Sequence, residues 1–283
     1  IPRFIGLNSE ASDNEQSKSL SVMTFNVKGF QYNAESDKTI AIANKDSILS
    51  IIKSLSPDMV CLQEYSSVKK SETSFHYVMT KKLGYEHFFA PTNSSNYVRG
   101  SVIYSKYPIT RSGTLFPMAK YYYSKTYVDL LVEKQTLRIY NVHLDSYRLS
   151  EEEKYEVNKI KDRKLISEET SKSILFKLLE TNKEQAKEVR ELKSVLDQTE
   201  EKYLLVGDFN ATPYSYTYQM LIENLKDSFV ERASGFSGTY NDLLPKFRID
   251  YILASQGIDF LSYQQDVYQY SDHNPVFVKF KLK

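Results

Sequence analysis

The sequence predicts an α/β domain in which mixed β-sheets are covered by outer helices. Short apolar runs of strand length alternate with segments of helical periodicity, and some neighbouring strands are separated only by the short polar turns that are typical of hairpins. Strands that alternate with helices favour parallel pairs, and hairpins add antiparallel pairs. The chain has 283 residues, of which 41% are hydrophobic, so it can bury a sizeable core.

The first part of the chain divides into a polar lead-in and a folded domain. Residues 8–19 are polar and carry no apolar periodicity, so we interpret residues 1–19 as a linker or N-terminal lead-in and residues 20–283 as the domain. Apolar and polar residues then alternate over residues 20–27, which predicts the first strand. A polar loop is expected to follow over residues 28–38.

The spacing of apolar residues predicts the later elements in order. Residues 151–202 are rich in Glu and Lys and contain neither Gly nor Pro, so one or two amphipathic helices are expected there. Gly100 is interpreted as a turn that precedes a strand. We expect helices over 40–55 and near 74–83, strands over 59–63, 87–90 and 101–104, a hairpin of strands 128–132 and 137–144, and strands over 203–206, 248–253 and 276–282.

Composition and charge exclude several classes of protein. The chain has 37 Lys and Arg against 36 Asp and Glu, so it lacks the global positive field of a protein that holds nucleic acid by neutralising phosphates. This net charge does not exclude a local basic groove. The single cysteine, Cys61, excludes a disulfide within the chain, and its apolar neighbours predict burial. No apolar stretch approaches the roughly 18 to 20 residues that span a bilayer.

Polar side chains repeatedly stand where an apolar strand ends. Each one taken singly has an ordinary explanation, such as a loop cap for an Asn or a satisfied core position for a His. Together they suggest that the strands deliver Asn, Glu, Asp and His to one rim, because strand ends held by a packed sheet are rigid platforms for a site. The residues in question are Asn26, Glu64, His143, Asp208, Asn210 and Asp250.

These residue types suit one kind of chemistry. Carboxylate and amide oxygens are the hard ligands that Mg²⁺ or Mn²⁺ prefers, and these ions also bind substrate phosphates. A histidine supplies either a hydrogen-bond donor to a phosphate oxygen or a general base. Metal-assisted attack of water on a phosphoester uses this set of residue types.

Six motifs, taken in order along residues 20–283, contain the polar residues at the strand ends. The motifs are Met23-Thr24-Phe25-Asn26-Val27, Leu62-Gln63-Glu64, Asn141-Val142-His143-Leu144, Gly207-Asp208-Phe209-Asn210-Ala211-Thr212-Pro213, Arg248-Ile249-Asp250-Tyr251-Ile252-Leu253 and Ser271-Asp272-His273-Asn274-Pro275-Val276. Each motif alone is a weak signal, but their combination in this order is highly specific. Together they resemble the endonuclease/exonuclease/phosphatase superfamily, whose fold is like that of deoxyribonuclease I.

The resemblance implies a four-layer α/β sandwich, with two facing mixed sheets flanked by helices, and divalent-metal hydrolysis of phosphoesters at one rim. It implies that Asn26, Glu64 and Asp272 hold Mg²⁺, with Mn²⁺ as the alternative ion. For catalysis it implies that Asp208 orients or deprotonates the attacking water, with Asn210 beside it on the phosphate. It also implies that His143 contacts the phosphate, that His273 is the base or the transition-state stabiliser, and that Asp250 orients the His273 imidazole.

Three functions remain open at this point. We expect a Mg²⁺-dependent hydrolase of phosphoesters, in particular phosphodiesters; the alternatives are an endo- or exonuclease acting on DNA or RNA and, ranked lowest, a non-catalytic interaction protein on the same fold. The fold and catalytic core cannot name the substrate. We expect the loops at 28–38, 92–100, 117–125 and 214–218 to decide it, whereas the Tyr clusters at 121–123 and 214–218 are interpreted as chance groupings in a chain with 23 Tyr.

The sequence also leads to expectations about partners and location. The expected partner is a phosphoester substrate, with nucleic acid as one alternative, and the chain is expected to be a monomer. The chain begins at Ile1 without Met, and residues 1–7 resemble the tail of a more apolar element, so we expect an extracytoplasmic protein that is exported or tethered to a membrane by a segment upstream of residue 1. A trimmed cytoplasmic protein explains the same observations.

Overall fold

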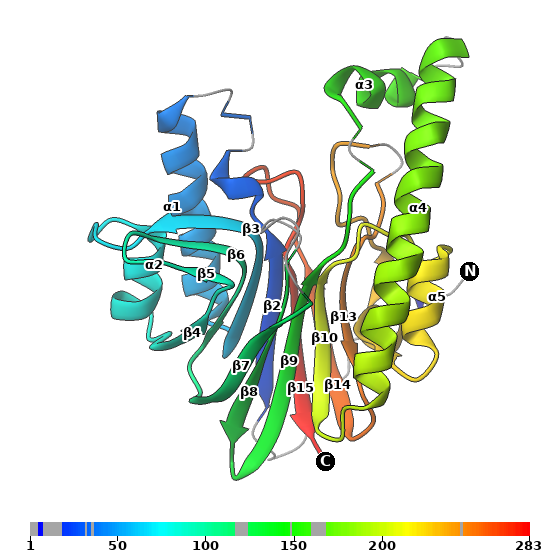
Figure 1. The fold of residues 1–283 in the computed structure, drawn as a ribbon. Helices are drawn as coiled ribbons and strands as arrows, with labels where there is room; N and C mark the ends of the chain where they lie inside the picture. Colours follow the sequence, from blue (N-terminus) through cyan, green and yellow to red (C-terminus); the bar gives the residue numbers. More distant parts are fainter. Residues whose placement is uncertain are drawn as a thin grey trace.

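Two β-sheets face each other in the computed structural model, and helices cover the outer face of each sheet (Figure 1). This arrangement confirms the predicted sandwich. The structure describes residues 5–7, 19–31, 33–34, 37–116, 124–147, 149–159, 168–243 and 246–283. Within this part of the chain, no helix is long and apolar enough to cross a membrane.

The first sheet has the strand order β14-β15-β2-β3-β6-β4, and β5 pairs with β6 beyond this path. Strands β2 and β3 are parallel, whereas the other neighbours are antiparallel, so the sheet is mixed. The strands are β2 (Leu20–Asn26), β3 (Met59–Val68), β4 (His87–Phe89), β5 (Thr92–Asn93), β6 (Tyr97–Ser105), β14 (Ile258–Gln265) and β15 (Val276–Leu282).

The second sheet has the order β11-β13-β10-β9-β8-β7 and is also mixed, because only β9 and β10 are parallel. The predicted hairpin is β8 and β9, and its two-residue turn, Glu133 and Lys134, has positive φ at both positions. The strands are β7 (Ile109–Leu115), β8 (Lys125–Val132), β9 (Gln135–His143), β10 (Lys202–Asp208), β11 (Lys226–Asp227) and β13 (Asp250–Ala254).

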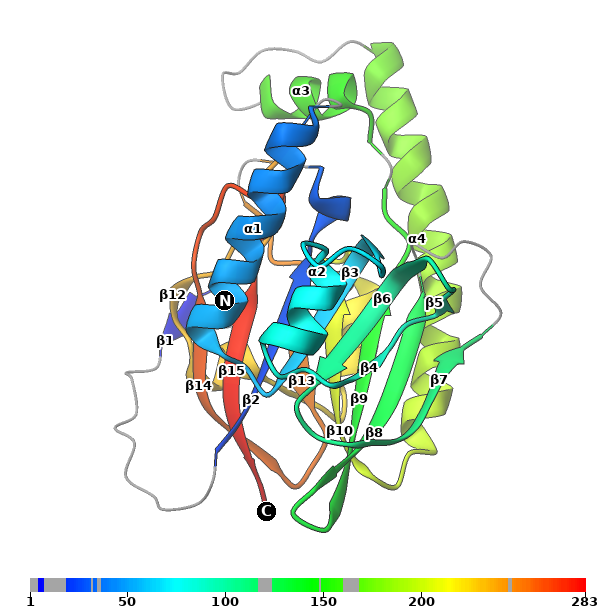
Figure 2. The same ribbon diagram turned by 90° about the vertical axis from the view of Figure 1, so that its left-hand side faces the viewer.

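Each sheet carries helices on its outer face. In Figure 2, α1 (Lys38–Leu55) and α2 (Phe75–Tyr77), which continues into the short π-helix η2 (Val78–Lys82), cover the first sheet. Helix α1 begins where the Asp37 side chain accepts a hydrogen bond from the Thr39 backbone N–H at 2.7 Å. The second sheet is covered by α4 (Glu168–Asp197) and α5 (Tyr216–Ile222).

Shorter elements complete the described chain. They are η1 (Lys28–Phe30), α3 (Glu151–Lys159), α6 (Ser228–Arg232), and a separate two-stranded sheet of β1 (Ile5–Leu7) and β12 (Ser234–Phe236). The predicted lead-in thus contributes one strand, while residues 1–4 and 8–18 lie outside the described residues. The polar loop expected over 28–38 begins with η1 and ends at α1.

Alternation along each strand divides the apolar side chains among three cores. The central core lies between the sheets and includes Val22, Cys61, Ile139 and Val206. Each of the two outer cores lies between one sheet and the helices that cover it. Burial of Cys61 confirms the prediction made from its apolar neighbours.

A buried polar layer crosses the central core just below the rim. The Gln63 side-chain amide donates to Asn141 Oδ1 at 2.7 Å and to Thr24 Oγ1 at 3.0 Å. The Asn141 amide donates back to the carbonyl oxygens of Leu62 and Val102. These bonds join the two sheets directly beneath the polar residues at the strand ends.

Several expectations differ from the structure. The turn predicted at Gly100 is wrong, because Gly100 lies inside β6, with φ of 103°. Most of the loop expected at 92–100 likewise belongs to β5 and β6. The sequence does not predict strands β7 and β14 or helices α5 and α6, because their apolar residues are sparse or too few to show a period.

Candidate active site

The site lies at the rim where the facing strands end, at the upper edge of the sheets in Figure 1. Strand side chains alternate between the two faces of a sheet. Because Val22 and Val206 point into the core between the sheets, Asn26 and Asp208 lie on the same faces at the ends of β2 and β10. The same alternation places His143 on this inner face of β9.

Strand register brings three of the predicted residues to one level. Asp208 on β10 pairs with His143 on the parallel strand β9 and with Asp250 on the antiparallel strand β13. All three side chains are about 99% buried. Three strands from different parts of the chain therefore deliver one histidine and two carboxylates side by side.

Glu64 reaches the site because β3 contains a bulge. The register between β3 and β6 shifts between Leu62 and Tyr65, and Glu64 has the left-handed φ of 51°. Simple alternation would direct Glu64 toward α1, but the extra residue directs it to the inner rim, and Tyr65 then returns to the outer core. A left-handed non-glycine residue costs on the order of 1 kcal/mol or more, which is consistent with a functional position.

The side chain of Asn26 joins two of the carboxylates. Its amide donates to Glu64 Oε1 and to Asp208 Oδ2, each at 3.0 Å. His143 Nε2 lies 3.5 Å from the same Asp208 oxygen and 3.8 Å from Glu64 Oε1. Four residues from four strands thus meet at one corner of the rim.

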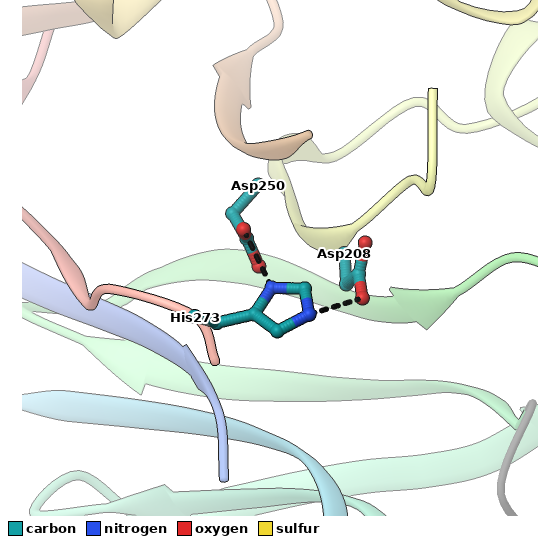
Figure 3. Close-up of side chains that lie close together, drawn as sticks. All are labelled: Asp208, Asp250 and His273. Carbon is teal, nitrogen blue, oxygen red and sulfur yellow. Dashed lines mark hydrogen bonds and ion pairs between the residues drawn. The ribbon is translucent and has the colours of Figure 1, made fainter. Parts of the chain in front are cut away.

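His273 reaches this group from the segment between β14 and β15. Its Nδ1 lies 2.9 Å from Asp250 Oδ2, and its Nε2 lies 3.6 Å from Asp208 Oδ2, as Figure 3 shows. The Tyr240 ring packs against the imidazole edge, with ring centroids 5.1 Å apart. Asp250 therefore fixes one ring nitrogen and leaves the other directed at Asp208.

Burial and neighbouring charges shift the protonation of this group. Burial raises the pKa of Asp208 to about 6, although the nearby His273 opposes the shift. Burial alone would lower the pKa of His273, but Asp250 and Asp208 outweigh it and raise that pKa well above its usual value. At neutral pH this favours an imidazolium at His273 beside the carboxylates.

Asn210 and Asp272 adjoin this group without joining its centre. The backbone N–H of Asn210 donates to Asp208 Oδ1 at 2.8 Å, and the Asn210 side-chain amide donates to the Leu144 carbonyl oxygen. Asp272 instead pairs with Lys28, whose Nζ lies 2.6 Å from its Oδ2. Burial would raise the pKa of Asp272, but His273 and Lys28 hold it below its usual value.

Two residues near the site are not among those predicted from the sequence. Lys28 follows the first motif and neutralises Asp272, and a lysine just after a strand-end Asn is the signal that could have identified it. Thr239 is fully buried, and its hydroxyl oxygen accepts hydrogen bonds from the backbone N–H groups of Ile249 and Asp250, both at 3.0 Å. No local pattern marks Thr239, because it meets Asp250 only through the folded chain.

Two donor sets could hold a cation. One is Asp208, Asp250 and His273, whose ligand atoms all lie within 4.8 Å of one another. The other is formed by Asn26 and Glu64, and the Glu64 side chain is about one-third exposed. Asp250 Oδ1 is buried and accepts no hydrogen bond from the described residues. The carboxylate of Glu64 and the amide oxygen of Asn26 are the hard ligands that fit a cation which keeps some of its waters.

Solved structures similar to this one share its fold. An endonuclease/exonuclease/phosphatase from Beutenbergia cavernae superposes with a TM-score of 0.62 at 19% identity, covering 94% of this chain and 72% of that one. The D. rerio TDP2 complexed with single-strand DNA product gives 0.62 at 15% identity, with coverage of 94% and 100%. The human Nocturnin catalytic domain with bound sulfate gives 0.61 at 18%, with 94% of each chain covered.

Sequence comparison agrees with the fold. No curated protein is significantly similar to the chain. The model of the Endonuclease/Exonuclease/phosphatase family matches residues 23–273, which include the strand-end residues described above. This match covers well over half of the sequence, and the facing mixed sheets have the architecture of the similar structures. The chain therefore belongs to the Endonuclease/Exonuclease/phosphatase family.

Proposed function

We propose that this protein is a divalent-metal-dependent hydrolase that cleaves phosphoester bonds, in particular phosphodiesters, by attack of water. Family membership supports phosphoester-hydrolase or nuclease-type activity in general. One observation carries the finer proposal: Asp208 Oδ2 lies within 3.6 Å of polar nitrogen atoms from Asn26, His143 and His273. A carboxylate placed among such donors can orient a water molecule and accept its proton while the donors contact the phosphate.

The two histidines have different supports and different roles. Asp250 holds His273 Nδ1, so His273 Nε2 is the nitrogen that donates to a phosphoryl oxygen as negative charge develops there. His143 is held by the register of β9 and contributes a second donor at the same level. We assign Asn210, whose backbone N–H donates to Asp208, to orienting the phosphate.

A hard cation fits the oxygen-rich edge of the site. Glu64 and Asn26 are the residues that would hold it, because the partly exposed Glu64 can bind an ion that keeps some of its waters. Asp272 would join them as a ligand only if it exchanged its pairing with Lys28 for the ion. Asp250 and His273 are already committed to each other. When bound, Mg²⁺ or Mn²⁺ would polarise the phosphoryl oxygen and lower the pKa of a bound water.

Nuclease activity is the second candidate within the same chemistry. It is favoured by the similarity to the D. rerio TDP2 that was solved with a single-strand DNA product. The net charge of +1 supplies no general attraction for nucleic acid, so a nuclease would have to bind its substrate through local contacts. A substrate panel separates this candidate from hydrolysis of small phosphoesters.

The decisive experiment measures turnover of a chromogenic bis-ester, single- and double-stranded DNA, RNA, sphingomyelin and inositol phosphates, with Mg²⁺, with Mn²⁺ and with excess chelator. We expect hydrolysis of at least one substrate with either ion and none in chelator. Glu64→Gln should weaken metal binding about 10- to 100-fold by calorimetry, because a charged oxygen ligand is lost. Glu201→Gln, which alters a carboxylate paired with Arg138, is the control. Full turnover in chelator would exclude the metal-dependent mechanism.

A further inference from the structure

Arg99 lies on the face of β6 that looks toward the site. Val98 and Val102 belong to the outer core beneath the helices, whereas Ile103 belongs to the core between the sheets. Alternation therefore puts Arg99, together with Ser101, on the inner face. Arg99 is half-buried there, one strand beyond the bulge that carries Glu64.

Hydrogen bonds farther from the rim show how far along its strand Arg99 lies relative to the site. Thr126 Oγ1 donates to the Ser101 carbonyl oxygen at 3.0 Å, and Thr126 pairs with Asn141 on β9. Ser101 and Asn141 are therefore at one level in the two facing sheets. Two residues nearer the rim than Ser101 and Asn141 are Arg99 on β6 and His143 on β9.

The Arg99 guanidinium has a stacking partner but, among the described residues, no anionic partner. Its Cζ lies 4.5 Å from the centre of the Tyr97 ring, two residues earlier on the same strand face. Its buried Nε makes no hydrogen bond, and no carboxylate of the described residues forms an ion pair with it. By contrast, the partly or fully buried Arg138 and Arg248 are each paired with an aspartate.

This arrangement suits a bound phosphate. A guanidinium stacked on an aromatic ring loses little further freedom on binding, and its terminal N–H groups can form two parallel bonds to phosphate oxygens. The site residues lie on β2, β3, β9, β10, β13 and the His273 segment, and β6 is the neighbour of β3 on the side away from β2. Arg99 is thus beside the reacting centre rather than within it.

We propose that Arg99, stacked on Tyr97, binds a phosphate group adjacent to the scissile phosphoester, so that preferred substrates carry at least two neighbouring phosphates. This inference rests on the proposed phosphoesterase function and narrows its substrate class. Two sources supply such a group: a nucleic-acid strand, or a small molecule with more than one phosphate. Arg99 is a specificity-determining residue, because it acts on a part of the substrate that does not react.

The kinetic test compares substrates that differ by one phosphate. Dithymidylate and trithymidylate form one pair, and inositol phosphate and inositol bisphosphate form the other. Arg99→Gln should raise KM about 10- to 100-fold for the two-phosphate member of the preferred pair, with kcat and the KM of its one-phosphate partner changed less than about twofold. The preferred pair identifies the source of the phosphate. Arg99→Lys, which keeps the charge, should recover part of the loss.

Arg111→Gln is the matched control, because Arg111 also lies over a tyrosine ring, that of Tyr127, but on the edge strand β7. It should leave every KM unchanged. An equal rise in KM for both members of a pair, or no rise with Arg99→Gln, would overturn the inference. Thermal melting of each variant shows whether the fold is retained.

A binding measurement separates this inference from the proposed function. Calorimetry with inorganic pyrophosphate and with orthophosphate needs no turnover. Arg99→Gln should weaken binding of pyrophosphate about tenfold or more while changing that of orthophosphate less than about twofold. An unchanged affinity for pyrophosphate overturns the role of Arg99. Absence of turnover on every substrate, together with the expected loss of pyrophosphate affinity, overturns the phosphoesterase assignment instead.

Discussion

Asp208 is the residue on which the other polar side chains of the site converge. We predict that Asp208→Asn lowers kcat about 10²- to 10⁴-fold, because an amide cannot accept the proton of the attacking water. The variant should keep its fold, since an Asn can still occupy the same position at the end of β10. Steady-state kinetics and circular dichroism check both parts.

The control for Asp208→Asn is Asp259→Asn, which alters a partly exposed carboxylate that pairs with Lys226 and Lys283. This control should keep its activity within about twofold, because pairs at the surface contribute little. Near-native turnover of a folded Asp208→Asn protein would remove Asp208 from the mechanism.

In the proposed mechanism Asp250 acts through His273, so its substitution should have a different signature. We predict that Asp250→Asn lowers kcat about 10- to 100-fold and leaves metal affinity unchanged, because an amide stabilises a charged imidazolium less well than a carboxylate does. Calorimetry with Mn²⁺ and single-turnover kinetics separate the two effects. A selective loss of metal binding would instead make Asp250 a ligand.

At the scale of elements, the junction of β9 and β10 has no room for a side chain at Gly207. Its φ is 138°, and a Cβ atom there would lie 2.0 Å from the Val142 carbonyl oxygen. We predict that Gly207→Ala lowers the free energy of unfolding by about 2 kcal/mol or more and impairs activity, because the strands that place His143 and Asp208 must separate.

Urea unfolding and kcat measure these two effects of Gly207→Ala. Gly235→Ala is a matched control, because Gly235 also has positive φ, but a Cβ atom there would have no neighbouring atom within 4 Å. Only the backbone strain should appear in the control, about 1 kcal/mol. Equal losses of stability in the two variants would show that steric contact with Val142 is not the cause.

At the scale of the whole molecule, a buried histidine makes stability depend on pH. His76 Nδ1 lies 2.8 Å from the Tyr104 hydroxyl, which in turn lies 2.8 Å from the Tyr65 hydroxyl. Burial, with a smaller contribution from nearby lysines, lowers the pKa of His76 from 6.5 to about 4. The His76 ring contacts Phe88 and Tyr104, which belong to the outer core between the first sheet and its helices.

The direction of the pH effect follows from this shift. Between pH 6.5 and 4 the unfolded chain binds a proton at His76 that the folded chain does not, so the free energy of unfolding falls as pH falls through this window. From pH 7 to pH 5 we predict that His76 accounts for a loss of about 1 to 2 kcal/mol. Urea unfolding of the wild type and His76→Asn at both pH values measures it. An equal pH dependence in the two proteins would contradict the assignment.

Much of the fold could be predicted because its signals are local. The alternation in β2 and the spacing of Ile48, Leu49 and Ile52 in α1 report burial directly. The edge strand β7 has mostly exposed or half-buried side chains, so its polar sequence shows little alternation. From the sequence alone, Gly100 suggests a turn. In the structure it lies opposite the bulge of β3, and this pairing depends on a strand that is distant in the sequence.

The sequence alone determined the α/β class, the order of the motifs and most of the residues at the rim, because strands that end in Asn, Glu, Asp or His show themselves in a few adjacent letters. Only the tertiary structure decided which of these side chains meet. The bulge at Glu64, the level shared by His143 and Asp208, and the pairing of Asp272 with Lys28 arise from register between strands distant in the chain. The position of Arg99 beside the site likewise depends on the tertiary structure, because the hydrogen bond from Thr126 to Ser101 joins its strand to the facing sheet.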